Sequence, residues 1–192
     1  MLSLIKEYKL PSTFPEQVVK EAKKYGDKID IKDIPNRVDC REHVIFTIDG
    51  EDAKDLDDAV RVIKLENGNY ELDVHIADVS YYVRENSLLD QEALTRGTSI
   101  YMLGRVIPML PRELSNGICS LNAGEDRFTL SCSMEIDKKG KVISSEIYKG
   151  IIKVTERMSY TDVQKIIDAS DEVTLKRYQP YIQEFKNMEE LA

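Results

Sequence analysis

The chain has 192 residues, a hydrophobic fraction of 42% and a formal net charge of −8, so it is large enough for one globular domain with a sizeable core. It contains no apolar run long enough for a membrane-spanning helix, and its net negative charge argues against nucleic-acid binding by overall electrostatic attraction. The N-terminus lacks the apolar centre of a secretory signal, and the three cysteines form no C-x-x-C pair. We therefore expect a cytoplasmic protein with reduced thiols.

The N-terminal segment is expected to form a leader helix. In "STFPEQVVKEAKKYGD", Thr13 is the expected N-cap, Pro15 lies in the first turn and Glu16 has capping-box spacing. The polar segment "KIDIKDIPNRVD" that follows has the composition of a linker. We therefore assign residues 1–36 to a leader helix and linker, and residues 37–192 to a separate folded unit.

An acidic segment separates a short buried strand, "HVIFTID", from a predicted hairpin. The two strands of the hairpin meet at Asn67-Gly68, the strongest short-range hairpin signal. The alternation places Ala59 on one strand on the same face as Val74 and Ile76 on the other. The acidic segment then joins two strands, and a sheet holds carboxylates more rigidly than a solvated charge run does.

The remainder of the chain predicts further helices and strands in turn. A helix capped by Ser87 is expected in "SLLDQEALTRG", followed by the loop "IPMLPRELSNGICSLNAGED", two strands in "RFTLSCSMEID" and "KVISSEIYKGIIKVTERMS", and a helix in "YTDVQKIIDAS". This order predicts an α+β fold with a mixed, largely antiparallel sheet and flanking helices. Apolar residues at helical spacing continue up to Leu191, so we expect the polypeptide to be part of a longer protein.

The segment "TIDGEDAKDLDDAV" holds six acidic residues and a single basic one, Lys54. Two carboxylates about 5 Å apart repel by roughly 3 kcal/mol at an effective dielectric near 20. The side chains relieve this repulsion by pointing into water, by holding protons or by binding a divalent cation. A pair of Mg²⁺ ions about 4 Å apart among carboxylates is a site for phosphodiester hydrolysis. The spacing alone leaves a solvated turn open, whereas an EF-hand is disfavoured because Gly50 follows Asp49 directly.

Three motifs in a fixed order add to this interpretation. "TIDGEDAKDLDDAV" is followed by "HIADVSYYV" and then by "IYMLGRVIPMLPRELSNGICSLNAGEDR". Together with the leader helix, they resemble the catalytic RNB domain of the ribonuclease II and ribonuclease R family, with ribonuclease R the nearer branch. The resemblance implies a processive 3′-to-5′ exoribonuclease that uses Mg²⁺ to hydrolyse RNA to nucleoside 5′-monophosphates.

The resemblance also assigns roles to residues in the acidic segment. The four acidic positions of the family correspond to Asp49, Asp55, Asp57 and Asp58, all of them metal-site residues. It implies that Asp49 and Asp58 ligate the metal and that Asp55 holds the metal or its waters. Asp55 and Asp57 are the predicted catalytic residues, and we expect the loss of Asp57 to be the most damaging.

The RNA itself is expected to contact residues of the third motif. Tyr101 matches the aromatic residue that stacks on the 3′-terminal base of single-stranded RNA, and stacking tolerates any sequence because every base has a π-face. Arg105 and Arg112 are candidate contacts to RNA phosphates, with ordinary surface arginines as the alternative. The resemblance further implies that residues 37–192 are the N-terminal half of the catalytic domain, accompanied in the whole protein by cold-shock-type modules and an S1 module. We therefore expect this part alone to be inactive and to bind metal only weakly.

Two functions from other classes remain open from the sequence. The first is an RNB-like module that has lost catalysis and serves in RNA binding or as a scaffold. The second is a domain stabilised by Ca²⁺ and without nucleic-acid chemistry. The presence of all four aspartates and the tyrosine favours the enzyme over both.

Overall fold

The computed structural model describes residues 2–192, with side chains described from residue 5 onward. Seven strands form one sheet in the order β1-β8-β7-β4-β3-β2-β9. The pairs β1–β8 and β2–β9 at the two edges are parallel, and the four pairs between them are antiparallel. The strands are β1 (Val38–Asp39), β2 (Phe46–Asp49), β3 (Asp58–Lys64), β4 (Tyr70–Ala77), β7 (Asp126–Ile136), β8 (Val142–Lys153) and β9 (Glu156–Ser159).

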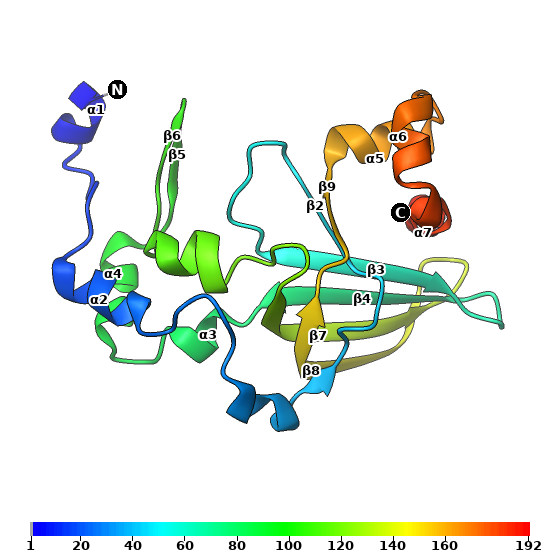
Figure 1. Ribbon diagram of the computed structural model, residues 1–192, viewed down its shortest axis with the longest axis horizontal. Coiled ribbons are helices and arrows are strands. Elements are labelled where there is room, and N and C mark those ends of the chain that lie inside the picture. The colour runs from blue at the N-terminus through cyan, green and yellow to red at the C-terminus, as the bar shows by residue number, and fades with distance from the viewer. Residues whose placement is uncertain (1) are drawn as a thin grey trace.

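Helices lie at both ends of this sheet, and a separate hairpin projects from the helices at one end (Figure 1). The N-terminal group is α1 (Leu2–Glu7), α2 (Glu16–Lys23), η1 (Ile31–Asn36), α3 (Val79–Tyr82), α4 (Leu88–Arg96) and η2 (Glu113–Ile118). The C-terminal group is α5 (Tyr160–Ile167), α6 (Glu172–Arg177), η3 (Gln179–Tyr181) and α7 (Ile182–Leu191). The hairpin consists of β5 (Ile100–Met102) and β6 (Arg105–Ile107). The predicted α+β class with a largely antiparallel sheet is confirmed. Within residues 2–192, none of the helices has the length and apolarity needed to cross a bilayer.

Two hydrophobic cores hold the acidic loop, residues 50–57, at its two sides. Leu56, inside the loop, is buried in the larger core together with Leu121 and Ile151. Phe46 on β2 is buried in the smaller core, where its ring lies 4.7 Å from that of Phe185 on α7. Complete burial of one such side chain contributes roughly 1.5–3 kcal/mol. The strand before the loop and the loop itself are therefore anchored in different parts of the protein interior.

The N-terminal segment differs from its prediction in two ways. Helix α2 begins at Glu16, and its N-cap is Pro15 without a side-chain cap bond, so the assignment of Thr13 as N-cap is wrong. The predicted linker contains η1 and β1 and is packed against the sheet. Arg37 forms a buried ion pair with Asp78, with 2.6 Å between guanidinium and carboxylate, and the two side chains are only 3% and 5% exposed.

The hairpin of β3 and β4 is confirmed, but its register is not the predicted one. Val60 pairs with Val74, and Ala59 pairs with His75, so Ala59 does not share a face with Val74. The connection is one residue longer than a two-residue turn, because the main-chain N–H of Leu65 donates to the carbonyl of Asn69 at 2.8 Å and leaves residues 66–68 between them. A shift of one residue moves every side chain to the opposite face.

Most other predicted elements are found at the expected places. Helix α4 is capped by Ser87, whose hydroxyl accepts from the main-chain N–H of Asp90 at 3.1 Å. The predicted loop after it is more ordered than expected, because it contains η2 and follows the β5–β6 hairpin. This hairpin and η2 line the candidate active site.

Candidate active site

The four predicted metal-site aspartates lie at the junction of two neighbouring strands. Asp49 is the last residue of β2 and Asp58 is the first residue of β3, whereas Asp55 and Asp57 belong to the loop between them. The two strands are antiparallel neighbours, paired through Phe46 and Val60. In Figure 1 the loop rises between the β5–β6 hairpin and the segment from β9 to α5. The strands therefore carry two of the four carboxylates at fixed positions of the sheet.

A buried serine holds the second part of the acidic loop. The hydroxyl of Ser120 accepts from the main-chain N–H of Leu56 at 3.1 Å and donates to the carbonyl of Lys54 at 3.0 Å. Ser120 is fully buried, and the side chain of Arg127 donates to its carbonyl at 2.8 Å. The main-chain N–H of Leu121 also donates to the carbonyl of Leu56. The segment "ICSLN" thus fixes the backbone immediately before Asp57.

The environment of the aspartates disfavours their charged forms. Burial raises the pKa of Asp57, and the nearby carboxylates of Asp55, Asp58 and Asp49 raise it further. Burial also raises the pKa of Asp49, followed by the charge of Asp58, while the guanidinium of Arg157 acts in the opposite direction. One carboxylate oxygen of Asp49, Oδ2, is buried and has no hydrogen-bond partner among the described residues. The loop therefore combines mutual repulsion with an unsatisfied acceptor, two conditions that a cation relieves.

The donor types of this loop suit a hard cation such as Mg²⁺, which binds carboxylate oxygens and water. The unpartnered oxygen of Asp49 is available to such an ion. In the part of the chain that the structure describes, however, no three Asp, Glu, His or Cys side chains converge closely enough to hold an ion between them. The four aspartates are near enough to raise one another's pKa, but they do not form a ready-made set of ligands.

Tyr101, on β5, reaches the acidic loop from the neighbouring hairpin. Its hydroxyl donates to Oδ2 of Asp55 at 2.7 Å, and this bond is the main reason that its pKa is raised to about 12. Tyr101 nevertheless remains 67% exposed, which leaves its ring accessible beside the acidic loop. Both residues line a cavity of about 360 Å³, whose walls are formed by Asp55, Asp57, Ile76, Ala77, Val79, Ser99, Tyr101, Met109, Leu110, Ser115 and Cys119.

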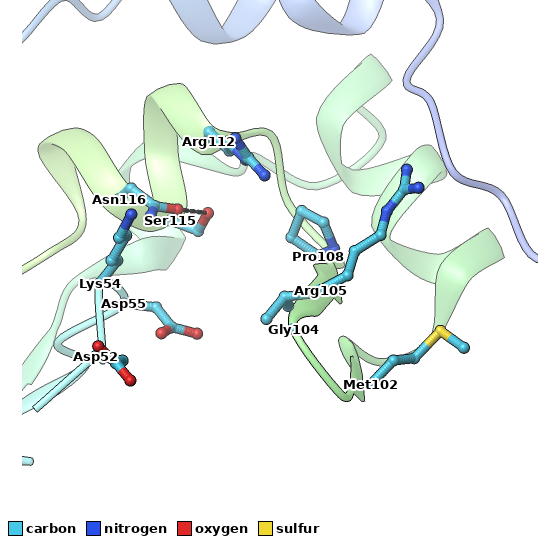
Figure 2. A pocket seen from close by; sticks show the side chains of 11 residues that line it. Asp52, Lys54, Asp55, Met102, Gly104, Arg105, Pro108, Arg112, Ser115 and Asn116 are labelled. Carbon is cyan, nitrogen blue, oxygen red and sulfur yellow. Dashed lines mark hydrogen bonds between the residues drawn. The ribbon is translucent and has the colours of Figure 1, made fainter. Parts of the chain in front are cut away.

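A second, larger cavity of about 570 Å³ lies next to the first and contains the two candidate RNA-contacting arginines. Figure 2 shows Asp52, Lys54 and Asp55 on one side of it, with Arg105 on the hairpin across from them and Arg112 above. Neither guanidinium makes a hydrogen bond or ion pair to any side chain that the structure describes. Asp55 and Ser115 line both cavities, so the two cavities adjoin beside the acidic loop, and we refer to the pair as the hollow.

Comparison with known proteins assigns the family. The family model described as RNB domain matches residues 37–192. This chain belongs to the RNB domain family. It is 52% identical over 182 residues to ribonuclease R of Thermotoga maritima, covering 95% of this chain and 25% of that protein. The RNB chain therefore spans about a quarter of the length of this curated relative.

Solved structures are similar to this RNB chain as well. Mycoplasma genitalium RNase R in complex with ribose methylated single-stranded RNA matches with a TM-score of 0.87 and 31% identity, covering 97% of this chain and 29% of that one. Yeast Ssd1, described as a pseudonuclease, matches with a TM-score of 0.64 and 21% identity over 75% of this chain and 18% of its own. At that identity the second likeness concerns the fold alone.

The RNB chain brings the seven sequence-predicted site residues to the same region and adds two that the sequence analysis missed. The predicted residues are the four aspartates at the β2–β3 junction, Tyr101 in contact with Asp55, and Arg105 and Arg112 across the adjoining cavity. The missed residues are Ser120 and Arg157, which bind the backbone of the acidic loop. Neither the residue type nor the sequence neighbours of Ser120 or Arg157 predict a contact with this loop, and both residues are distant from it in sequence.

Proposed function

We propose that this chain forms part of the catalytic unit of a Mg²⁺-dependent 3′-to-5′ exoribonuclease that processively releases nucleoside 5′-monophosphates. The observation that carries the proposal is the group of four aspartates at the β2–β3 junction, beside an exposed tyrosine that contacts one of them. The names of the ribonuclease R relatives support this activity. The RNA in the similar Mycoplasma genitalium structure supports RNA as the substrate.

In this proposal the acidic loop holds the metal. Asp49 and Asp58 are the proposed direct ligands, because they stand at strand ends and Asp49 offers an unpartnered oxygen. Asp55 and Asp57 complete the site from the loop. When bound, Mg²⁺ supplies charge neutralisation at the scissile phosphate and activation of the attacking water.

The other residues of the hollow are proposed to bind the RNA end. The exposed ring of Tyr101 stacks on the 3′-terminal base, and this contact requires no particular sequence. Arg105 and Arg112 face the RNA backbone, where their guanidinium groups attract phosphates. The hollow then places the 3′ end of a single strand between a stacking group and a negatively charged loop.

A catalytically dead RNB-like module is the second candidate function. Yeast Ssd1, which is described as a pseudonuclease, has a similar fold. All four aspartates and Tyr101 are present in this chain, which favours the enzyme. We also propose that the whole protein carries cold-shock-type and S1 modules. We further propose that it acts in the cytoplasm, because its three cysteines are free thiols.

The test is the variant Asp57→Asn in the whole protein. With a 5′-labelled single-stranded oligoribonucleotide and Mg²⁺, the unchanged protein should release nucleoside 5′-monophosphates from the 3′ end. Loss of one group that supports transition-state charge lowers kcat by roughly 10²–10³, so we expect at least this loss in the variant. The binding of RNA, measured by fluorescence anisotropy, should remain.

The matched control is Glu51→Gln, which removes one negative charge from an exposed position of the same loop. This variant should keep the activity. Full turnover in Asp57→Asn, or release of products from the 5′ end by the unchanged protein, would rule out the proposed mechanism. RNA binding without any hydrolysis by the unchanged protein would favour the catalytically dead module.

A further inference from the structure

The first part of the acidic loop is bound by a single side chain from the edge strand β9. Nη2 of Arg157 donates to the carbonyls of Glu51 and Ala53, both at 2.8 Å, and lies 3.3 Å from the carbonyl of Gly50. These carbonyls belong to a turn that the main-chain bond from Ala53 to Gly50 closes at 3.1 Å. One guanidinium nitrogen thus lies within hydrogen-bond distance of three of the four carbonyls of this turn.

The strand that carries Arg157 is itself firmly placed. β9 runs parallel to β2, so Arg157 lies opposite Thr47, and Ser159 lies opposite Asp49. Met158, between them, is buried in the smaller core. The guanidinium therefore starts from a fixed point next to the end of β2, where the acidic loop begins.

The contact is directed at the backbone and not at the acids. Exposed arginines commonly pair with carboxylates, and such pairs contribute little. Arg157 lies beside an acidic loop, yet its hydrogen bonds to that loop all go to main-chain carbonyls. The loop gains a defined path, while no aspartate oxygen is consumed by an ion pair with Arg157.

We propose that Arg157 is a positioning residue, which holds the 50–53 turn so that the aspartates on either side of it are presented to the metal. The expected effect on metal binding rests on the proposed function. The ordering of the turn does not, and it can be measured independently. Loss of a residue that orients metal ligands without binding the metal itself typically lowers the metal affinity by about 10–100-fold.

The experiment compares Arg157→Ala and Arg157→Lys with the unchanged chain, all within the whole protein, by two measurements. The first is amide hydrogen exchange at Ala53, with Leu56 as an internal reference because Ser120 holds its amide independently. The second is binding of Mn²⁺ alone, followed by the electron paramagnetic resonance signal of the free ion. Arg177→Ala is the matched control, since it removes an exposed arginine of α6 remote from the loop.

We expect Arg157→Ala to accelerate exchange at Ala53 and to weaken Mn²⁺ binding by about tenfold, with Leu56 exchange and the thermal midpoint unchanged. Arg157→Lys should restore most of the slow exchange at Ala53 and most of the Mn²⁺ affinity, because an ammonium group offers three donors from one nitrogen. The control should behave like the unchanged chain.

The two proposals fail in different ways. Unchanged Ala53 exchange and Mn²⁺ affinity in Arg157→Ala would overturn the positioning role and leave the proposed function intact. Failure of the unchanged chain to bind Mn²⁺ would count against the proposed function, and Ala53 exchange would then decide the positioning role alone. A loss of folding in Arg157→Ala that Arg157→Lys does not repair would also overturn the positioning role.

Discussion

At the scale of single residues, the charge of Asp57 is a liability for folding that the proposed metal relieves. Its pKa is raised above the ordinary value of 3.8, first by burial and then by Asp55, Asp58 and Asp49. Below pH 3.8 the group is protonated in both folded and unfolded chains and has no effect on stability. As the pH rises, the unfolded chain releases the proton first, so the folded state loses stability until the pH exceeds the folded pKa.

The raised pKa of Asp57 predicts a pH-dependent effect of Asp57→Asn on the free energy of unfolding. The variant should match the unchanged chain below pH 3.8 and should be more stable at neutral pH. The surrounding protein crowds Asp57 enough to raise its pKa, but much of the residue still contacts water. Solvent screening therefore limits the gain to less than about 1 kcal/mol. Urea unfolding in metal-free buffer at the two pH values measures it. A less stable variant at neutral pH would mean that the carboxylate makes a favourable contact and not a repulsive one.

The residues of the site differ in how far the sequence reveals them. The four aspartates are visible because they lie within ten positions of one another, and carboxylates so close in sequence need an explanation. Ser120 and Arg157 give no such signal, since 64 residues separate Ser120 from Leu56 and 106 separate Arg157 from Glu51. Only the folded chain brings their donors to the carbonyls of the loop.

At the scale of elements, the acidic loop depends on the "ICSLN" segment that follows η2. Ser120→Ala removes the acceptor for the N–H of Leu56 and the donor for the carbonyl of Lys54. The N–H of Leu56 then lacks a partner in a buried place, and the carbonyl of Lys54 lacks one in a partly buried place. An unpaired buried polar group costs about 1–3 kcal/mol. We expect this loss of stability in urea unfolding, together with faster amide exchange at Leu56.

A second serine-to-alanine variant tests whether the expected loss of stability is specific to position 120. Ser144→Ala, at an exposed position of β8, should change stability by less than about 0.5 kcal/mol. If Ser120→Ala were equally neutral and Leu56 exchange were unchanged, the segment would not hold the loop.

Element types were more predictable than their details. Alternation and the Asn67-Gly68 pair predicted the β3–β4 hairpin, yet the three-residue connection around Gly68, which has a φ of +81°, shifted the register by one. Turn length depends on how the two strands pack, and this information is not contained in the turn residues alone. The predicted N-cap at Thr13 was wrong because α2 begins at Glu16, and its N-cap, Pro15, has no side chain that could accept a capping hydrogen bond.

At the scale of the whole molecule, the RNB chain has a net negative charge although its proposed substrate, RNA, is an anion. The net charge is −8, and only a few basic groups, among them Arg105 and Arg112, face the hollow. The curated relatives are about four times longer, since this chain covers 23–26% of the first three of them. We therefore expect RNA affinity to depend on polypeptide outside these residues, whereas the metal site depends on residues within them.

The central claim is that the aspartates at the β2–β3 junction bind a divalent cation for phosphodiester hydrolysis. Anomalous X-ray diffraction from crystals of the whole protein grown with Mn²⁺ locates such an ion directly. We expect a peak within coordination distance of Asp49 and Asp58, with Asp55 and Asp57 turned toward it. A well-ordered loop with its carboxylates apart, and Mn²⁺ bound only elsewhere, would contradict the claim.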